Sequence, residues 1–223
     1  MTIHFQRDMD RLHRKILSMF ALVEETVHRS VEGLHARNPD SLAEILQRDA
    51  EINRHDVEVE EDCLKILALH QPVAVDLRRV TAVLKITGEL ERVGDLGVNI
   101  AERTSGLANY AEPPIPPRLK EMSEISLHML HEAIDAFVEL NTNVARKICA
   151  DDDKVDRLND IILGELKEQM SQTPSLINPA MHLFSVTRHL ERIADHATNI
   201  AEDVVYLVEG EIIRHQGNPD GDN

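Results

Sequence analysis

The sequence predicts an all-α protein made of two tandem, pseudo-symmetric three-helix bundles, with six long helices in all. Residues 90–102 (LERVGDLGVNIAE) recur as residues 190–202 (LERIADHATNIAE), and the two segments are identical at eight of thirteen positions, at an offset of 100 residues. Apolar residues at spacings of three and four surround both copies, which is typical of helices that pack along one face. Between the copies, the segment AEPPIPP at 111–117 holds four prolines, cannot be helical and divides the chain into matching halves.

The first half, residues 1–110, is expected to form three helices. Asn38 and Pro39 should end the first helix and start the second, because asparagine can cap free N–H groups and proline suits the first turn of a helix. Pro72 ends the second helix or opens the third. The three helices are expected at about 4–36, 40–69 and 72–107.

The second half, residues 118–214, is expected to repeat this bundle after the proline linker at 111–117. Three successive aspartates at 151–153 suit a helix N-terminus and should open the fifth helix. Asn178 and Pro179 repeat the cap-and-proline signal and should open the sixth. The helices are expected at about 118–150, 151–171 and 178–214, followed by a polar tail at 215–223 that we expect to be disordered.

Composition excludes several classes of function. Forty acidic residues against 24 basic ones give a formal net charge of −16, which argues against nucleic acid and anionic membrane surfaces and favours cations or basic partners. No apolar run is long enough to span a bilayer, and the N-terminus lacks the apolar core of a signal peptide. Cys63 and Cys149 are isolated, as expected of idle thiols in a reducing compartment. We therefore expect a cytoplasmic protein.

Four of the helices carry duplicated rows of side-chain oxygens. Glu91, Asp95 and Asn99 fall within a narrow arc around the third helix, on the flank away from the apolar seam, and the sixth helix repeats this arc. The second and fifth helices add acids at positions that interrupt their apolar phase, where a carboxylate is costly unless it is paired, hydrated or bound to metal. The predicted metal ligands are Asp49, Asn53, Asp56, Glu91, Asp95, Asn99, Asp152, Asp156, Glu191, Asp195 and Asn199.

Oxygen ligands of this kind suit Mg, Ca, Mn, Fe or Zn and do not choose among them. The alternative interpretation is a solvated acidic face on long surface helices, in which case the protein is a metal-free scaffold for basic partners. Asn159 also falls on the apolar phase of the fifth helix, in register with Asp56 of the second. The recurrence of this costly arrangement in both halves favours metal binding.

Other candidate sites are weaker. His182, His189 and His196 are spaced by seven on one edge of the sixth helix, but they have no counterparts in the first half, so we expect them to be solvated. A di-iron helical-bundle enzyme needs two Glu-x-x-His motifs. Glu25 and His28 form one in the first half, and the corresponding region of the second half, around residues 138–141, has none. Gly94 and Gly97 are expected to allow close contact between helices. No phosphate-binding glycine loop is present.

The chain resembles the PhoU family, the accessory and regulatory proteins of the phosphate-specific transport system. The resemblance rests on residues 71–74 (QPVA), 76–78 (DLR), 90–101 and 190–195, and covers nearly the whole chain. It implies a fold of two similar three-helix bundles. It also implies surface metal sites built on an acid followed four residues later by Asp. That motif stands here as Glu91 with Asp95, Asp152 with Asp156 and Glu191 with Asp195. The fourth instance departs, because Asp49 is followed by Asn53, so this site is expected to be weaker or to recruit Asp56.

The resemblance further implies that the protein is not an enzyme. It implies repression of phosphate-starvation signalling when phosphate is ample, through an adaptor that bridges the ATPase subunit of the phosphate transporter and a membrane sensor histidine kinase. A homodimer is expected from the same resemblance. Metal identity (Fe, Zn, Mn or Mg) stays open.

Overall fold

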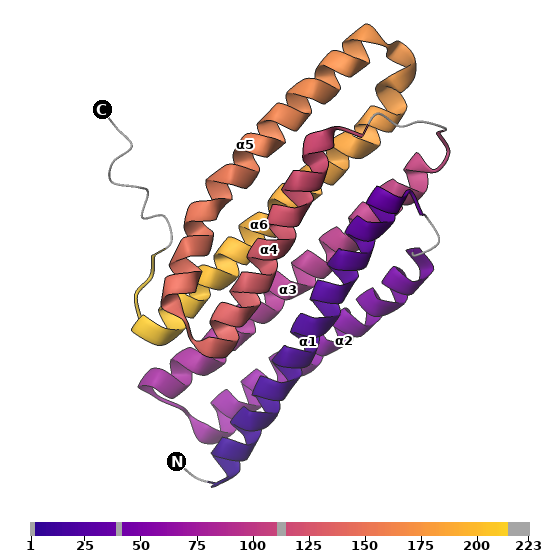
Figure 1. Cartoon of the computed structure of the whole chain (residues 1–223). Helices are drawn as coiled ribbons and strands as arrows, with labels where there is room; N and C mark the ends of the chain where they lie inside the picture. The colour runs from indigo at the N-terminus through magenta and orange to yellow at the C-terminus, as the bar shows by residue number, and fades with distance from the viewer. Residues whose placement is uncertain (1–2, 39–41, 111–114, 214–223) are drawn as a thin grey trace, which may run out of the picture.

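Six α-helices account for nearly all of the structure, a computed structural model that describes residues 3–38, 42–110 and 115–213 (Figure 1). The elements are α1 (Ile3–Ala36), α2 (Leu42–His70), α3 (Ala74–Leu107), α4 (Pro117–Glu139), α5 (Thr142–Gln172), a short 3-10 helix η2 (Pro174–Leu176) and α6 (Ile177–Glu209). The described residues contain no strand, which confirms the predicted all-α class. None of the described helices has the length and apolar character needed to cross a membrane.

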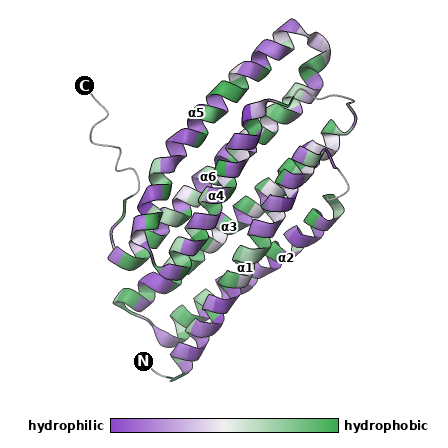
Figure 2. Ribbon diagram, in the orientation of Figure 1, coloured by the Kyte–Doolittle hydropathy of each residue, from purple (hydrophilic) through white to green (hydrophobic). Residues whose placement is uncertain are grey.

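Helices α3 and α6 lie side by side in the middle of an elongated molecule. Helix α3 packs against α1 and α2 of its own half, and α6 packs against α4 and α5, while α1 also meets α4. Figure 1 shows the outer helices α2 and α5 at opposite edges. Hydrophilic and hydrophobic residues alternate along each helix in Figure 2, as expected of amphipathic helices that bury one face. Both halves therefore turn a central helix toward each other.

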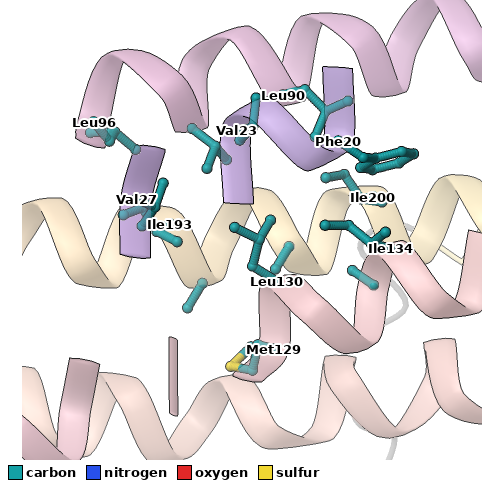
Figure 3. Packing of buried hydrophobic residues seen from close by; sticks show 14 of the residues in the cluster. Phe20, Val23, Val27, Leu90, Leu96, Met129, Leu130, Ile134, Ile193 and Ile200 are labelled. Atoms are coloured by element: carbon teal, nitrogen blue, oxygen red, sulfur yellow. The ribbon is translucent and has the colours of Figure 1, made fainter. Parts of the chain in front are cut away.

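The two halves share one hydrophobic core. Buried side chains from both halves form a single contiguous cluster, and Figure 3 shows Val23 and Leu90 of the first half close to Leu130 and Ile200 of the second. All four side chains are almost fully buried. Each such side chain contributes about 1.5–3 kcal/mol relative to an exposed one, so the halves are held by their core as well as by the linker.

The predicted boundary between the fourth and fifth helices is wrong. Helix α4 ends at Glu139, because Leu140 adopts a left-handed backbone conformation with φ of 54°. Asn141 then caps α5, accepting hydrogen bonds from the backbone N–H groups of Asn143 and Val144, both at 3.2 Å. The three aspartates at 151–153 consequently lie inside α5 and do not open it.

Two other predicted limits shift. Pro117, placed in the linker, is the first residue of α4, where its fixed φ suits the helix. Helix α6 ends at Glu209, short of the predicted 214, because Gly210 takes a left-handed conformation with φ of 78°. Pro39, residues 111–114 and the tail lie outside the described residues.

Gly94 and Gly97 confirm the predicted close helix contacts. A Cβ atom at Gly94 would lie 3.1 Å from Ile52 Cδ1 on α2, and one at Gly97 would lie 3.4 Å from Thr26 and Val27 on α1. The absence of side chains at these two positions lets both neighbours approach α3 closely.

Candidate metal-binding grooves

Acids from α2 and α3 face one another at the surface of the first half. Burial raises the pKa of Asp49, and the carboxylate of Asp95 across the groove raises it further. Burial also raises the pKa of Glu91, which is raised again by its neighbours Asp95, Asp56 and Asp49. These effects require the four carboxylates to lie close together. We name Asp49, Asp56, Glu91 and Asp95 the first groove.

Helices α5 and α6 repeat this arrangement. Burial raises the pKa of Asp152 to about 6, with further contributions from Asp195, Asp156 and Asp153. The pKa of Asp195 is raised by desolvation and then by Asp156, even though the residue as a whole is exposed. We name Asp152, Asp156, Glu191 and Asp195 the second groove.

The two grooves are not identical. Arg188 Nη1 donates to Glu191 Oε1 at 2.8 Å, and this cation counteracts the burial that raises the pKa of Glu191. The equivalent of Arg188 in the first half is Gly88, 100 residues earlier, which offers no charge. In the second groove, therefore, the charge of the Glu191 carboxylate is already partly neutralised by Arg188.

Buried oxygens without hydrogen-bond partners test whether a cation suits these grooves. Asp49 Oδ1 in the first groove, Glu191 Oε2 in the second and Asn159 Oδ1 on α5 are all buried and accept no hydrogen bond. Such oxygens are costly unless a cation or water reaches them. Within the part of the chain that the structure describes, no three His, Cys, Asp or Glu side chains are already arranged around one point as ligands. Carboxylate oxygens are suitable ligands for a hard cation. The side chains of the grooves would have to rotate to complete the coordination of that cation.

Three predicted ligands are asparagines with other surroundings. Asn53 Nδ2 donates to Asp49 Oδ2 at 3.2 Å, so this amide already supports a first-groove carboxylate. Asn199 Nδ2 donates to Glu89 Oε2 at 3.0 Å and thus reaches from α6 toward α3. Asn99 is half-buried on α3, one turn beyond Asp95. The structure brings together the eight predicted carboxylates in two groups of four. Only Asn53 is bonded to one of them, whereas Asn199 is directed toward Glu89 on α3.

The prediction that the three α6 histidines are solvated is wrong. His196 is only 9% exposed, and its Nδ1 lies 2.6 Å from Glu89 Oε2. The half-buried His189 has a pKa lowered to about 4 by burial and by Arg103 and Arg192. His182, also half-buried, contacts the Tyr110 ring, with centroids 6.3 Å apart. The face of α6 that carries these histidines packs against α3 of the first half. A prediction that treats each three-helix bundle separately does not include this contact.

The sequence did not predict that Glu89 contacts His196 and Asn199 of the other half. Glu89 occupies the position equivalent to His189, so the duplication gave no second acid to draw attention to it. The sequence did contain a signal for this contact, namely the absence of duplication. An acid found only in the first half and histidines found only in the second are suited to pair with each other across the two halves.

The Glu-x-x-His motif at Glu25 and His28 is not directed into the core, and a second such motif, Glu32 with His35, lies on the same helix with Glu32 exposed. Glu25 Oε1 pairs with Arg29 Nε at 2.5 Å, and His28 Nε2 lies 3.4 Å from Glu32 Oε1, all within α1. His28 is exposed. This geometry does not reproduce the inward-facing ligand set of a di-iron bundle.

Comparisons with known proteins agree on one family. The PhoU domain model matches the chain twice, at residues 16–104 and 119–204. A phosphate-specific transport system accessory protein PhoU homolog from Aquifex aeolicus is 39% identical over 212 residues, covering 94% of this chain and 95% of that protein.

Solved structures give the same result. The crystal structure of PhoU from Pseudomonas aeruginosa superposes with a TM-score of 0.91 at 33% identity, covering 93% of this chain and 100% of that one. The phosphate transport system regulatory protein PhoU from Streptococcus pneumoniae gives a TM-score of 0.85 at 29% identity, over 93% and 98% of the two chains. With a domain match in each half and relatives that align along nearly its whole length, this chain belongs to the PhoU family.

Proposed function

We propose that this protein is a non-enzymatic, metal-binding regulator of phosphate uptake and phosphate-starvation signalling in the cytoplasm. Its relatives are named as accessory or regulatory proteins of phosphate transport, which supports the regulatory role. The protein would act as an adaptor between the ATPase subunit of the phosphate transporter and a sensor histidine kinase, as a homodimer. The observation that carries the metal role is the pair of acid groups on neighbouring helices, in which a buried oxygen of Asp49 and one of Glu191 accept no hydrogen bond.

The grooves explain how a cation would affect the adaptor. At neutral pH each groove holds like charges in partly desolvated positions, which opposes the close approach of the helices that carry them. A bound Fe, Zn, Mn or Mg ion would supply positive charge that neutralises this repulsion. In the first groove Asp49, Asp56, Glu91 and Asp95 would hold it, and in the second Asp152, Asp156, Glu191 and Asp195. The same residues would then present a fixed, less acidic face to a partner.

Elemental analysis tests the metal role directly. Protein purified without added metal or chelator should contain a transition metal or Mg at a reproducible ratio. Replacing Asp49, Glu91, Asp152 and Glu191 by their amides should remove that metal and abolish repression in a phosphate-responsive reporter, while helical content stays unchanged. A control with amides at the exposed acids Asp10, Glu121, Glu124 and Asp160 makes the same change in net charge outside the grooves. Repression by the groove variant equal to that of the control would contradict the metal role.

A metal-free scaffold is the second candidate, because the carboxylates of the described residues are not yet arranged around one point. Metal-free protein that binds its partners and represses fully would establish it. An enzymatic role would require oxidase or phosphatase turnover by metal-loaded protein that is lost in Glu91→Ala.

A further inference from the structure

Three nitrogen-bearing side chains gather where the end of α3 lies beside the start of α6 (Figure 1). They are Arg103 of α3 and His182 and His189 of α6, and all three are half-buried. Arg103 lies close enough to His189 for its charge to lower the pKa of that ring. The ring of His182 lies against the backbone of α3, because a Cβ atom added to Gly106 would stand only 2.4 Å from its Cε1. We name Arg103, His182 and His189 the nitrogen cluster.

Four nitrogen atoms of this cluster lack hydrogen-bond partners. Arg103 Nε, His182 Nδ1 and both ring nitrogens of His189 are buried, and none of them is bonded to another of the described residues. A guanidinium Nε always carries a proton, and a neutral imidazole carries one on either of its two nitrogens. Arg103 and His189 therefore present at least two buried N–H donors without an acceptor. Buried polar atoms in this state are uncommon in native proteins, so several in one place indicate a missing ligand or water.

The other end of the α3–α6 contact shows which group is missing. There Lys85 Nζ on α3 lies 3.2 Å from Asp203 Oδ1 on α6, and Asp203 is almost fully buried. Arg103 stands at the place of Asp203, 100 residues earlier, and Ser185 stands at the place of Lys85. The duplication thus puts a cation where the first half of the contact has a buried acid, and a neutral serine where that acid has its partner.

A second pair of equivalent positions gives the same result. Glu89 Oε2 lies 2.6 Å from His196 Nδ1. In the second half His189 takes the place of Glu89, and in the first half Leu96 takes the place of His196. Neither replacement is an acid. The nitrogen cluster therefore lacks both of the carboxylates, Glu89 and Asp203, that accept from nitrogen atoms at the other end of the contact.

A cavity of about 280 Å³ adjoins the cluster at Tyr110. The Tyr110 ring lines this cavity and also contacts the His182 ring, with centroids 6.3 Å apart. Arg37 lines the same cavity and brings a further guanidinium to it. Small anions can therefore reach the edge of the cluster along a route that carries positive charge, although the chain as a whole has a net charge of −16.

We propose that the nitrogen cluster binds a small oxyanion of the phosphate and sulfate class, which takes the place of the missing carboxylates. Arg103 donates a charge-assisted hydrogen bond to it, and His189 donates its one N–H. A metal cation is a poorer occupant of the two histidines, because the guanidinium of Arg103 lies beside them and repels it. Water would satisfy the donors but would leave the charge of Arg103 without a counterion. The site shares no residue with the two grooves, so the proposal goes beyond the metal role and does not depend on it.

Calorimetric titration with inorganic phosphate and, separately, with sulfate tests the proposal. The protein is the full chain, freed of metal by a chelator that is then removed, so that phosphate cannot bind to a cation in the grooves. Arg103→Gln removes the charge, and His189→Leu removes the ring donor. The matched control is Arg14→Gln, which makes the same charge change at an exposed position of α1. Circular dichroism checks that each variant keeps its helical content, and either cluster variant alone is sufficient for the comparison.

We expect at least one of the two anions to bind saturably at one site. The affinity should fall about tenfold or more in Arg103→Gln, because a charge-assisted hydrogen bond is lost. It should fall in His189→Leu as well and stay unchanged in Arg14→Gln. A preference for phosphate or for sulfate would support the proposal and identify the anion.

Three results would overturn the proposal. One is the absence of saturable binding of either anion at millimolar concentration. Another is binding that both cluster variants leave intact, which would place the anion elsewhere. The third is an equal loss of affinity in Arg14→Gln, which would show that only the net charge of the chain matters. Each of these results leaves the proposed regulatory function standing, because that function is tested by metal content and by repression.

Discussion

Glu89 and His196 join the two halves of the molecule across the α3–α6 interface, with Glu89 Oε2 2.6 Å from His196 Nδ1. Asn199 Nδ2 donates to the same oxygen at 3.0 Å. Because His196 is only 9% exposed, removal of the carboxylate leaves buried polar groups without their acceptor. We expect Glu89→Ala to lower the free energy of unfolding by about 1–3 kcal/mol, measured by urea denaturation. Glu102→Ala, at an exposed position of the same helix, should change it by no more than about 0.5 kcal/mol, and equal effects in the two variants would contradict the role of this contact.

Asp152 should make stability depend on pH in metal-free protein. Its pKa is raised to about 6 in the folded state from 3.8, by burial and by three other acids. The folded state is therefore destabilised above pH 6, and the penalty shrinks as the pH falls from 6 toward 3.8. We expect Asp152→Asn to stabilise chelator-treated protein by about 1–2 kcal/mol at pH 7.5, with partial solvent screening taken into account, and by less at pH 4.5.

The same substitution should reduce the stabilisation that added metal gives. Excess Mn²⁺ should raise the melting temperature of the wild type more than that of Asp152→Asn, because a ligand that binds only the folded state stabilises it. An equal shift in both proteins would show that Asp152 does not contribute to cation binding.

Asn53 offers a gain-of-affinity test of the first groove. The amide now donates to Asp49, whereas an aspartate would add a charged oxygen and restore the spacing found in the other three motifs. With the second groove disabled by Asp152→Asn and Asp156→Asn, Asn53→Asp should bind Mn²⁺ about tenfold more tightly by calorimetry, since ligand charge tunes affinity. Asn143→Asp, which makes the same charge change at an exposed site of α5, should have no effect.

Gly94 should tolerate no side chain without loss of stability. An added methyl group would stand 3.1 Å from the fully buried Ile52, and such overpacking costs about 1–3 kcal/mol. Gly88 in the same helix has nothing within 4 Å of an added Cβ, so Gly88→Ala should instead stabilise by about 0.5–1 kcal/mol. Thermal unfolding of both variants checks the contrast in sign. A stabilising Gly94→Ala would refute the close packing of α2 on α3.

Periodicity alone predicted most of the fold, because the apolar seams of α3 and α6 are long and regular and their residues are indeed buried. The α4–α5 boundary escaped prediction for a physical reason. The apolar spacing continues from Leu140 through Val144 to Ile148, without proline or glycine to interrupt it. The chain turns at a leucine in a conformation that leucine rarely adopts, and only the capping asparagine signals the change.

The sequence predicted the rows of side-chain oxygens along individual helices. It did not predict which helices lie next to each other, and so which rows come together. Helical phase places Glu91 and Asp95 on one flank of α3, yet it carries no information on which helix lies across from that flank. The histidines of α6 illustrate the same limit. Glu89, the partner of His196, lies 107 residues earlier in the chain, and only the packing of α3 on α6 brings the two together.

The contact between Gly94 and Ile52 would limit which cation the first groove could hold. Gly94 immediately precedes Asp95, and Ile52 immediately precedes Asn53, so the hydrophobic contact beneath sets the gap between the two acidic walls. In the second half Ala194 stands at the place of Gly94 and Val155 at the place of Ile52, so one methyl group is gained and one is lost at the corresponding contact. Aliphatic packing next to the carboxylates would thus set the space open to the cation that we propose, through a different pair of side chains in each half.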